Sequence, residues 1–381
     1  MSPQIFHPSP FPLLTSIREL ILSARKAVVH SVDIIQVLTN FEIGRRIVEH
    51  EQQGEERAEY GKALLKELAA SLTDEFGRGF SRSNLQNMRK FYLTYSDRLP
   101  EKCQMPSGKS LVPEKSQTAS GEFPAIANLP TAPAGGKPVF TLSWSQYVFL
   151  IAIDNPKERS FYEIEAASNG WTLPELKRQF NSGLYERLAL SRHKDEIRNL
   201  AREGQVISRP EDLLKEPYVL EFLGLDEKAR YSETDLESAI IDKIEHFLLE
   251  LGKGFLFEAR QKRFTFDDEH FFIDLVFYNR LLRCYVLIDL KIGRLTHQHL
   301  GQMQMYVNYF DRFVKLTEEL PTVGIILCKK KHDALVEITL PKDANIYAKE
   351  YQLYLPDKEE LRRKLVEWSA EAERSVGGGG E

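Results

Sequence analysis

Residues 269–291 read Glu-His-Phe-Phe-Ile-Asp-Leu-Val-Phe-Tyr-Asn-Arg-Leu-Leu-Arg-Cys-Tyr-Val-Leu-Ile-Asp-Leu-Lys. Two apolar runs flank a short polar break, which is the pattern of a hairpin of buried strands. Asp274 interrupts the first run, and Asp289 and Lys291 end the second. Because an unpaired carboxylate inside a sheet is costly, these three residues indicate a functional site.

The spacing predicts that the three side chains share one face of the hairpin. Strand residues two apart point the same way, so Asp289 and Lys291 lie together. A turn at Arg280-Leu281 would set residue 274 opposite residue 287, which leaves Asp274 one diagonal from Asp289. A slip of one residue would separate the two acids.

Two carboxylates on one face favour a hard divalent cation, Mg²⁺ with Mn²⁺ as the alternative, and the Leu290 carbonyl is a candidate third ligand. Lys291 could orient or deprotonate a water, or stabilise charge on a phosphorane. We therefore interpret the hairpin as the centre of a metal-dependent nuclease. The alternative is structural, with both acids neutralised by Arg260 or Arg283.

The flanking helices supply further candidates. In a predicted helix over 233–251, Glu237 falls inside the apolar arc, where a third acid would face the site. A capping box of Thr234 with Glu237 is the competing explanation. In the helix predicted at 297–311, Gln302 and Tyr306 lie four apart and are candidates for positioning substrate, or simply a surface Gln beside a packed Tyr.

Composition sets the class of protein. The chain has 381 residues, 42% of them hydrophobic, with a net charge of −5, so any nucleic-acid binding must come from local patches. Three cysteines without a Cys-x-x-Cys pair argue against a zinc site or a disulfide framework. No apolar run is long enough to span a membrane, and the first residues do not resemble a signal peptide. We expect a cytoplasmic protein.

Along the chain, hydrophobic periodicity predicts an α+β protein of two domains. Helices are expected at 13–50, 60–72, 144–153, 158–169, 172–191 and 195–203, and strands at 254–264, 270–278, 283–290, 322–328 and near 346–355. We assign 1–98 and 139–212 to a helical N-terminal domain and 213–356 to an α/β core of helix, three-stranded meander, helix and strand. Residues 99–138 read as a disordered linker, 357–374 as a C-terminal helix and 375–381 as a flexible tail.

Two sets of basic and polar residues are candidates for nucleic-acid binding. Residues 73–92 resemble a helix-turn-helix, and its second helix carries Arg82, Asn84, Arg89 and Lys90. Two packed helices with a solvated polar face would look the same. Near the predicted site, the candidate phosphate contacts are Arg260, Lys262 and Arg294, each of which could equally be a solvated charge.

A family resemblance adds to these inferences. Asp274, followed after fourteen residues by Asp289-Leu290-Lys291, resembles the PD-(D/E)XK nuclease signature, and Gln302-x-x-x-Tyr306 is similar to the motif that follows it in many members. Ile273 and Asp289 stand where relatives often carry Pro and Glu. The whole chain resembles the YhcG-like family, which joins an N-terminal domain of unknown function to a PD-(D/E)XK domain. The stretches that carry this resemblance are Phe41–Val48, Glu75–Ser81, Phe161–Ala167, Leu184–Ser191, Pro217–Gly224 and Phe247–Phe255.

The resemblance implies a restriction-endonuclease-like core, with Glu237, Asp274, Asp289 and Lys291 as the catalytic set and DNA binding by the N-terminal helices. We therefore expect a Mg²⁺-dependent endonuclease acting on DNA, with branched or foreign DNA as candidate substrates and a homodimer as the expected assembly. The alternative is a non-catalytic DNA-binding or assembly protein that keeps the nuclease scaffold. A structural protein without nucleic-acid function is the third hypothesis.

Overall fold

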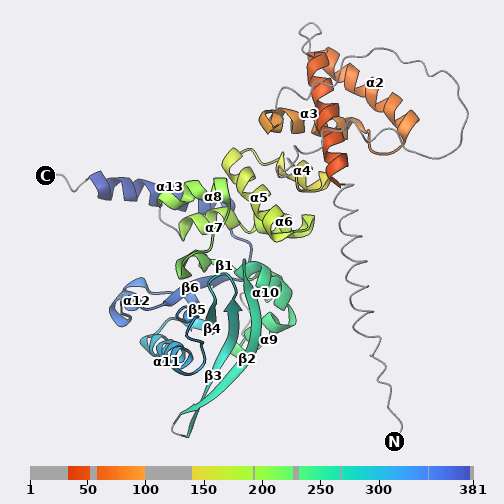
Figure 1. Ribbon diagram of the computed structural model, residues 1–381. Helices are drawn as coiled ribbons and strands as arrows, with labels where there is room; N and C mark the ends of the chain where they lie inside the picture. The colour runs from red at the N-terminus through yellow and green to blue at the C-terminus, as the bar shows by residue number, and fades with distance from the viewer. Residues whose placement is uncertain are drawn as a thin grey trace, which may run out of the picture. The chain divides into compact units, whose positions relative to one another are not determined.

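The computed structural model describes residues 33–51, 58–98, 140–191, 194–225, 231–266, 268–341 and 343–377 (Figure 1). The chain forms two compact units, Met1–Asn155 and Pro156–Glu381. The predicted helices at 158–203 thus belong to the same unit as the sheet, and the domain boundary expected near residue 212 stays a prediction. The expected linker at 99–138 lies outside the described residues. No described helix is both long and apolar enough to cross a membrane.

The first unit is helical in its described part. It contains helical residues 33–51, α2 (Ala58–Phe76), α3 (Arg82–Tyr95), a short 3-10 turn (Ser96–Arg98) and α4 (Trp144–Leu150). The turn between α2 and α3 uses Gly77 and Gly79 at positive φ, a conformation that glycine adopts without strain. Ser81 then caps α3 by accepting a hydrogen bond from the Asn84 N–H at 3.3 Å. Leu85 and Met88 of α3 pack with Ile47 and Leu65 in a small core.

The second unit opens with α5 (Pro156–Asn169), α6 (Leu173–Asn181), α7 (Leu184–Leu190) and α8 (Lys194–Glu203). The single helix predicted at 172–191 is divided between α6 and α7. Gly183 causes the break because it sits at φ 65°, in the left-handed region that a continuing helix cannot use.

A six-stranded sheet follows, within the described residues, in the order β1-β6-β5-β4-β3-β2. Its strands are β1 (Tyr218–Val219), β2 (Phe255–Phe266), β3 (Glu269–Asn279), β4 (Cys284–Arg294), β5 (Val323–Lys330) and β6 (Ile346–Gln352). β2, β3 and β4 form an antiparallel meander, whereas β4, β5, β6 and β1 pair in parallel. The predicted α+β order is confirmed. β1 was not predicted, because a two-residue strand has no periodicity to detect.

Helices cover both faces of the sheet (Figure 1). On one face, α9 (Glu233–Asp242) and α10 (Ile244–Leu251) pack through Leu236, Ile240 and Phe247. The predicted continuous helix over 233–251 breaks between them at Lys243, which has φ −123°. On the other face, α11 (His297–Phe313) is the crossover between parallel β4 and β5. Gly324 allows its close approach, since a Cβ there would lie 2.7 Å from the Met303 side chain.

The remaining helices are α12 (Asp333–Thr339), which was not predicted, and α13 (Lys358–Gly377), which begins one residue later and ends three residues later than the helix expected at 357–374. Lys358 and Arg362 of α13 pair with Glu158 of α5, whose side chain is buried. These ion pairs fix the C-terminal helix against the helices that open the second unit.

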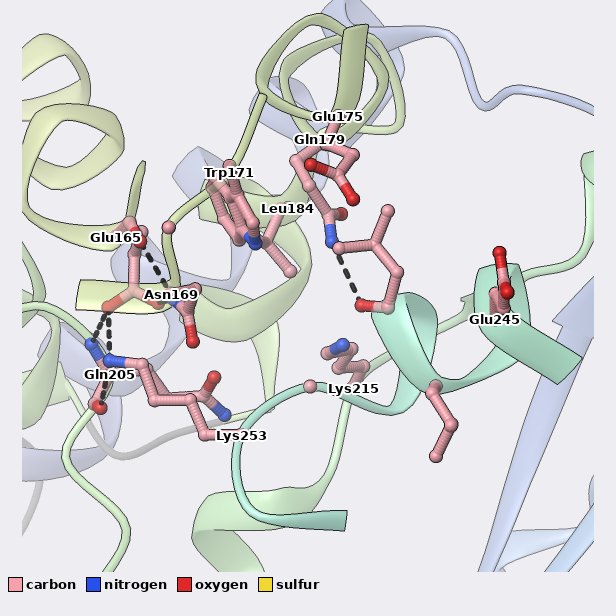
Figure 2. A pocket seen from close by; sticks show the side chains of 14 residues that line it. Glu165, Asn169, Trp171, Glu175, Gln179, Leu184, Gln205, Lys215, Glu245 and Lys253 are labelled. Carbon is pink, nitrogen blue, oxygen red and sulfur yellow. Dashed lines mark hydrogen bonds and ion pairs between the residues drawn. The ribbon is translucent and has the colours of Figure 1, made fainter. Parts of the chain in front are cut away.

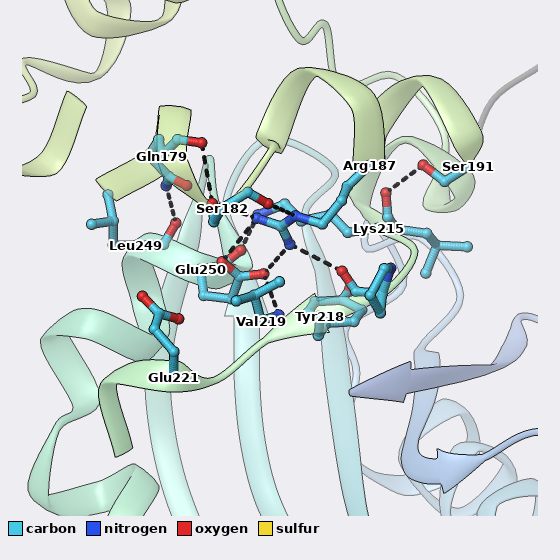
Figure 3. Close-up of polar contacts among 12 residues, drawn as sticks. Gln179, Ser182, Arg187, Ser191, Lys215, Tyr218, Val219, Glu221, Leu249 and Glu250 are labelled. Atoms are coloured by element: carbon cyan, nitrogen blue, oxygen red, sulfur yellow. Dashed lines mark hydrogen bonds and ion pairs between the residues drawn. The ribbon is translucent and has the colours of Figure 1, made fainter. Parts of the chain in front are cut away.

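A buried polar network joins α6 and α7 to α10 and to the segment that enters β1 (Figure 3). Arg187 and Glu250 are both fully buried, and the Arg187 guanidinium contacts Glu250 Oε1 at 2.5 Å. Arg187 also donates to the carbonyls of Ser182 at 2.8 Å and Pro217 at 3.0 Å. The second Glu250 oxygen pairs with Arg178 at 2.8 Å. Each buried charge therefore has partners, which is the condition for burying it at tolerable cost.

The register of the β3–β4 hairpin differs from the predicted one by two residues. The strands close at Asn279 and Cys284, so the turn covers 280–283 and not Arg280-Leu281 alone. Val276, not residue 274, lies opposite Leu287. The Asn279 side chain explains the longer turn, because its Oδ1 accepts hydrogen bonds from the N–H groups of Leu281 and Leu282, both at 3.1 Å. An even slip leaves every side chain on its face, so Asp274 and Asp289 still meet.

Candidate active site

The two acids of the hairpin meet where β3 leaves β4. The last pair of that ladder is Leu275 with Ile288, and Asp274 is the next residue along β3. Its Oδ2 accepts a hydrogen bond from the Leu290 N–H at 2.8 Å. The Asp274 carboxylate thus accepts the hydrogen bond that a main-chain carbonyl of β3 would accept if the ladder continued. The carboxylate is therefore held by the backbone of the Asp289-Leu290-Lys291 segment.

Asp289 and Lys291 form a buried ion pair beside Asp274. Asp289 is 2% exposed, and its Oδ2 lies 2.8 Å from Lys291 Nζ. Burial raises the pKa of Asp289 to about 7, with a further contribution from the Asp274 charge, although Lys291 opposes the shift. For Lys291, burial alone would lower the pKa, but Asp289, Asp274 and Glu233 outweigh it and raise the pKa. Lys291 Nζ also donates to the Leu290 carbonyl at 3.2 Å.

Helix α9 brings two glutamates to the site, one turn apart. Glu237 is buried, and its Oε2 accepts from Gln261 Nε2 at 2.5 Å. Glu233 Oε2 lies 3.3 Å from Lys291 Nζ. Burial, with the Asp274 charge, raises the pKa of Glu237. The capping-box alternative for Glu237 is wrong, because Ser232 and Asp235 form the capping box of this helix.

Gln261 connects the third acid to the hairpin, and the sequence did not indicate it. Besides its bond to Glu237, its Nε2 donates to Asp274 Oδ1 at 3.1 Å. Gln261 lies opposite Asp274 in the β2–β3 ladder and has φ 45°, a left-handed conformation that is uncommon in a strand. A β-bulge between Phe257 and Ala259 precedes it. Glu233 was also missed, although its position four residues before Glu237 placed it on the same helical face.

Tyr306 lies near the acids but is buried in the protein interior, whereas Gln302 beside it is partly exposed. Tyr306 is fully buried, and its hydroxyl donates to the Phe272 carbonyl at 2.8 Å. Gln302 Nε2 donates to the same hydroxyl at 2.5 Å. Burial, together with the Asp289 charge, raises the pKa of Tyr306 to about 12. A direct contact of Tyr306 with substrate does not fit this burial, and the packed-Tyr alternative describes it better.

The candidate basic residues differ in how far they are already paired. Arg260 Nε lies 3.4 Å from Glu237 Oε1, and Lys262 Nζ lies 3.5 Å from Glu258 Oε1. Arg294 is exposed at the end of β4. The structural alternative, in which Asp274 and Asp289 pair with Arg260 or Arg283, is wrong because Lys291, Leu290 and Gln261 supply their contacts.

In α3, two of the predicted nucleic-acid contacts hold the first unit together. Asn84 Oδ1 accepts from Trp144 Nε1 at 2.9 Å, and Arg89 Nε pairs with Glu51 at 2.6 Å. Arg82 and Lys90 are exposed on the same helix. The two exposed side chains are therefore better placed to contact a ligand than the two paired ones.

The residues present suit a divalent cation of the Mg²⁺ type. Within the described ranges, no three His, Cys, Asp or Glu side chains converge as a metal cage. Asp274, Asp289 and the Leu290 carbonyl nevertheless offer hard oxygen donors, and Mg²⁺ commonly takes one or two carboxylates while keeping several waters. Burial and the neighbouring Asp274 charge both disfavour the ionised form of Asp289 and raise its pKa, an effect that a bound cation would oppose.

A separate pocket of about 270 Å³ lies away from these acids (Figure 2). Trp171, Gln179, Gln205, Lys215 and Lys253 are among its lining residues, and none of the acids or the lysine of the hairpin site lines it. Burial lowers the pKa of Lys215 to about 7, and its ammonium donates to the Glu250 carbonyl. The pocket and the cluster of Asp274, Asp289 and Lys291 are therefore two separate sites.

Comparison with known proteins identifies the family of the chain. Residues 211–366 match the YhcG PDDEXK nuclease domain, and residues 16–187 match the DUF1016 N-terminal domain. Residues 211–366 are thus a domain of the PDDEXK nuclease class. A relative from Escherichia coli (strain K12), "Putative nuclease YhcG", is 40% identical over 352 residues, which are 92% of each chain. The chain belongs to the YhcG family.

Solved structures resemble the chain only distantly. A repair endonuclease from Pyrococcus abyssi is 16% identical, with a TM-score of 0.23, over 34% of this chain and 50% of that one. An EndoMS–dsDNA complex is 14% identical, with a TM-score of 0.23, over 35% of this chain and 50% of that one. The chain spans about half the length of these structures, and the family assignment does not depend on them.

Proposed function

We propose that this protein is a divalent-metal-dependent endonuclease that hydrolyses phosphodiester bonds in DNA. The observation that carries the proposal is the meeting of Asp274, Asp289 and Lys291 at the point where β3 leaves β4. Two buried or half-buried carboxylates beside one ammonium are expensive to maintain in a fold that does not use them. Membership of a family with a PDDEXK nuclease domain supports the same chemistry.

Asp274, Asp289 and the Leu290 carbonyl would hold the ion, with Mg²⁺ preferred and Mn²⁺ as the alternative. A bound divalent ion lowers the pKa of a water and offsets negative charge on phosphate. The Leu290 N–H fixes the orientation of the Asp274 carboxylate through their hydrogen bond at 2.8 Å. The protein thus positions its donors before any substrate arrives, which is how preorganisation lowers a barrier.

Lys291 acts as a fixed positive charge. Its pKa is raised, so at neutral pH the ammonium keeps its proton and is a poor base for water. Glu233 and Asp289 hold it from two sides, at 3.3 and 2.8 Å. Of the roles considered for this lysine, orienting the water and stabilising charge on the phosphorane fit better than deprotonation.

Glu237 serves as the outer acid, and it acts through Gln261. The Gln261 amide bridges Glu237 and Asp274, so the helix and the hairpin are joined at the site. Gln302 and Tyr306 support this region from α11, and Gln302 is the member of that pair that could approach substrate. The exposed residues Arg82 and Lys90, with Arg260, Lys262 and Arg294, are proposed phosphate contacts.

The test is cleavage of plasmid and branched DNA in Mg²⁺ or in EDTA. Wild type should cut only with the metal, and Asp274→Ala should lose at least a hundredfold in rate, the scale of removing one preorganised electrostatic group. Asp242→Ala is the matched control, because Asp242 is an exposed acid of α9. Equal trace activity in wild type and Asp274→Ala would reject the proposal.

The same assay separates the non-catalytic alternative. A protein that binds DNA with wild-type folding but cuts neither substrate in Mg²⁺ or Mn²⁺ would be a binding or assembly protein. Comparing branched with linear DNA tests the branched substrate, and sedimentation of the full chain tests the expected homodimer. A cytoplasmic location completes the proposal.

A further inference from the structure

The strands that carry Gln261 and Asp274 continue beyond the sheet as a two-stranded arm, formed by residues 261–266 and 269–274. Pairing of β3 with β4 stops at Leu275, whereas pairing of β2 with β3 goes on to Phe266 opposite Glu269. Figure 1 shows β2 and β3 extending past the other strands. The arm therefore begins at the candidate active site.

One face of the arm is fixed to α11. Phe264 stacks on Tyr309 with ring centroids 4.1 Å apart, and Phe264 and Ile273 are both buried. The Tyr306 hydroxyl adds a hydrogen bond to the Phe272 carbonyl. These contacts hold the arm in one position relative to the acids, so its other face is presented without a large ordering cost.

The other face is exposed and continuous with the site. Directly opposite residues of an antiparallel pair point to the same side. Asp274 lies opposite Gln261, Phe272 opposite Arg263, and His270 opposite Thr265, whose hydroxyl lies 2.9 Å from the imidazole. Phe272 is 45% exposed, and Arg263 makes no ion pair with any residue in the described part of the chain.

We infer that this outer face, made of Arg263, Thr265, His270 and Phe272, is a binding surface for unpaired nucleotides of the nucleic acid that reaches Asp274. A guanidinium neutralises the charge of a phosphate, and an exposed aromatic ring can stack on a base that is not already stacked in a duplex. Phe272 lies on β3, the strand that carries Asp274, and Arg263 lies opposite it on β2, so a bound strand would run from the arm to the acids. The inference rests on the proposed nuclease function and adds the form of its substrate.

The experiment measures binding of a fluorescent single-stranded oligonucleotide, and of the matching duplex, by anisotropy in EDTA, where cleavage cannot occur. Phe272→Ala should weaken single-strand binding at least about fivefold and leave duplex binding closer to wild type, because base stacking on an aromatic is worth about 1–3 kcal/mol. Phe272→Trp should keep the affinity. Phe266→Ala is the matched control, since Phe266 is 59% exposed but lies on the opposite face of the same arm.

The contribution of the Arg263 charge is tested by the salt dependence of single-strand binding. Arg263→Gln should reduce the slope of log affinity against log salt by about 0.7, the value for one phosphate contact on a single strand. Arg280→Gln, an exposed arginine in the β3–β4 turn, should leave the slope unchanged. Melting curves of all variants should match wild type.

The outcomes distinguish the arm from the nuclease function. If Phe272→Ala binds single strands as tightly as wild type while Asp274→Ala loses cleavage, the arm inference is wrong and the nuclease stands. If Phe272→Ala weakens single-strand and duplex binding equally, the preference for unpaired nucleotides is wrong. Wild type that binds neither form and does not cleave would overturn both proposals.

Discussion

Replacing Arg187 by Met should destabilise the second unit by about 3–5 kcal/mol, the cost of leaving a buried charge without its partner. Arg187 has no exposed surface and contacts Glu250, Ser182 and Pro217 at hydrogen-bond distances. Methionine fills much of the same volume, so the loss comes from the charge and not from a cavity. Glu250 would keep Arg178 and Lys215 as its cationic neighbours, which places the expected cost at the lower end of that range.

The pKa of Glu250 reports on the whole network, in which Arg187 has the largest effect of three cationic neighbours. Burial alone would raise this pKa, but Arg187, Arg178 and Lys215 lower it to about 2 from an ordinary value of 4.5. A carboxylate with a lowered folded pKa stabilises the fold above its unfolded value and loses that contribution as the pH falls through the folded one. The shift corresponds to about 3 kcal/mol, present above about pH 4.5 and lost toward pH 2.

The assay is urea unfolding followed by tryptophan fluorescence, since Trp171 lies in the second unit. At pH 7, Arg187→Met should unfold at lower urea with an unchanged m-value. Between pH 4.5 and 2 the variant should lose less stability than wild type, because Glu250 then titrates nearer its ordinary pKa. A variant within about 1 kcal/mol of wild type at pH 7, with the same pH dependence, would refute the reasoning.

Three further predictions concern single features. Tyr306→Phe should destabilise by about 1 kcal/mol in thermal unfolding, because the Phe272 carbonyl loses the hydroxyl that donates to it; an unchanged Tm would show that the bond contributes nothing. Gly183→Ala should cost more than about 1 kcal/mol, since φ is 65° and a Cβ would lie 2.7 Å from Leu361, and urea unfolding measures it against wild type. Mg²⁺ at a hundredfold excess over Kd should stabilise wild type by about 3 kcal/mol, which is measured as a rise in Tm, and should leave the Tm of Asp289→Ala unchanged; equal Tm shifts in both proteins would place the ion elsewhere.

The sequence predicted the strands of the meander and the α11 crossover because apolar alternation and long helical periods are local signals. It also indicated that Asp274 and Asp289 share a face, and the prediction survived a register error because the error was even. The error itself arose from the turn, where the Asn279 side chain organises four residues. That contact is made by one side-chain oxygen and leaves no trace in hydrophobic periodicity.

Other parts of the site depend on tertiary geometry that no local pattern carries. Gln261 reads as one polar residue in a polar strand, and only its left-handed φ and the approach of α9 bring it between two acids. The spacing of Gln302 and Tyr306 predicted that they are neighbours but not that Tyr306 is buried. The break at Gly183 was missed because apolar residues continue at helical spacing on both sides of it.

The irregular shape of β2 also bears on solubility. β2 is the outermost strand of the sheet and is twelve residues long, and no strand of the described residues pairs with its outer side. A flat edge of that length is a template for joining another chain, edge to edge. The bulge after Phe257 and the left-handed Gln261 interrupt the row of donors and acceptors, and Arg260, Lys262 and Arg263 add like charges that repel a second copy. The same distortion that carries an amide to the acids therefore protects the edge from aggregation.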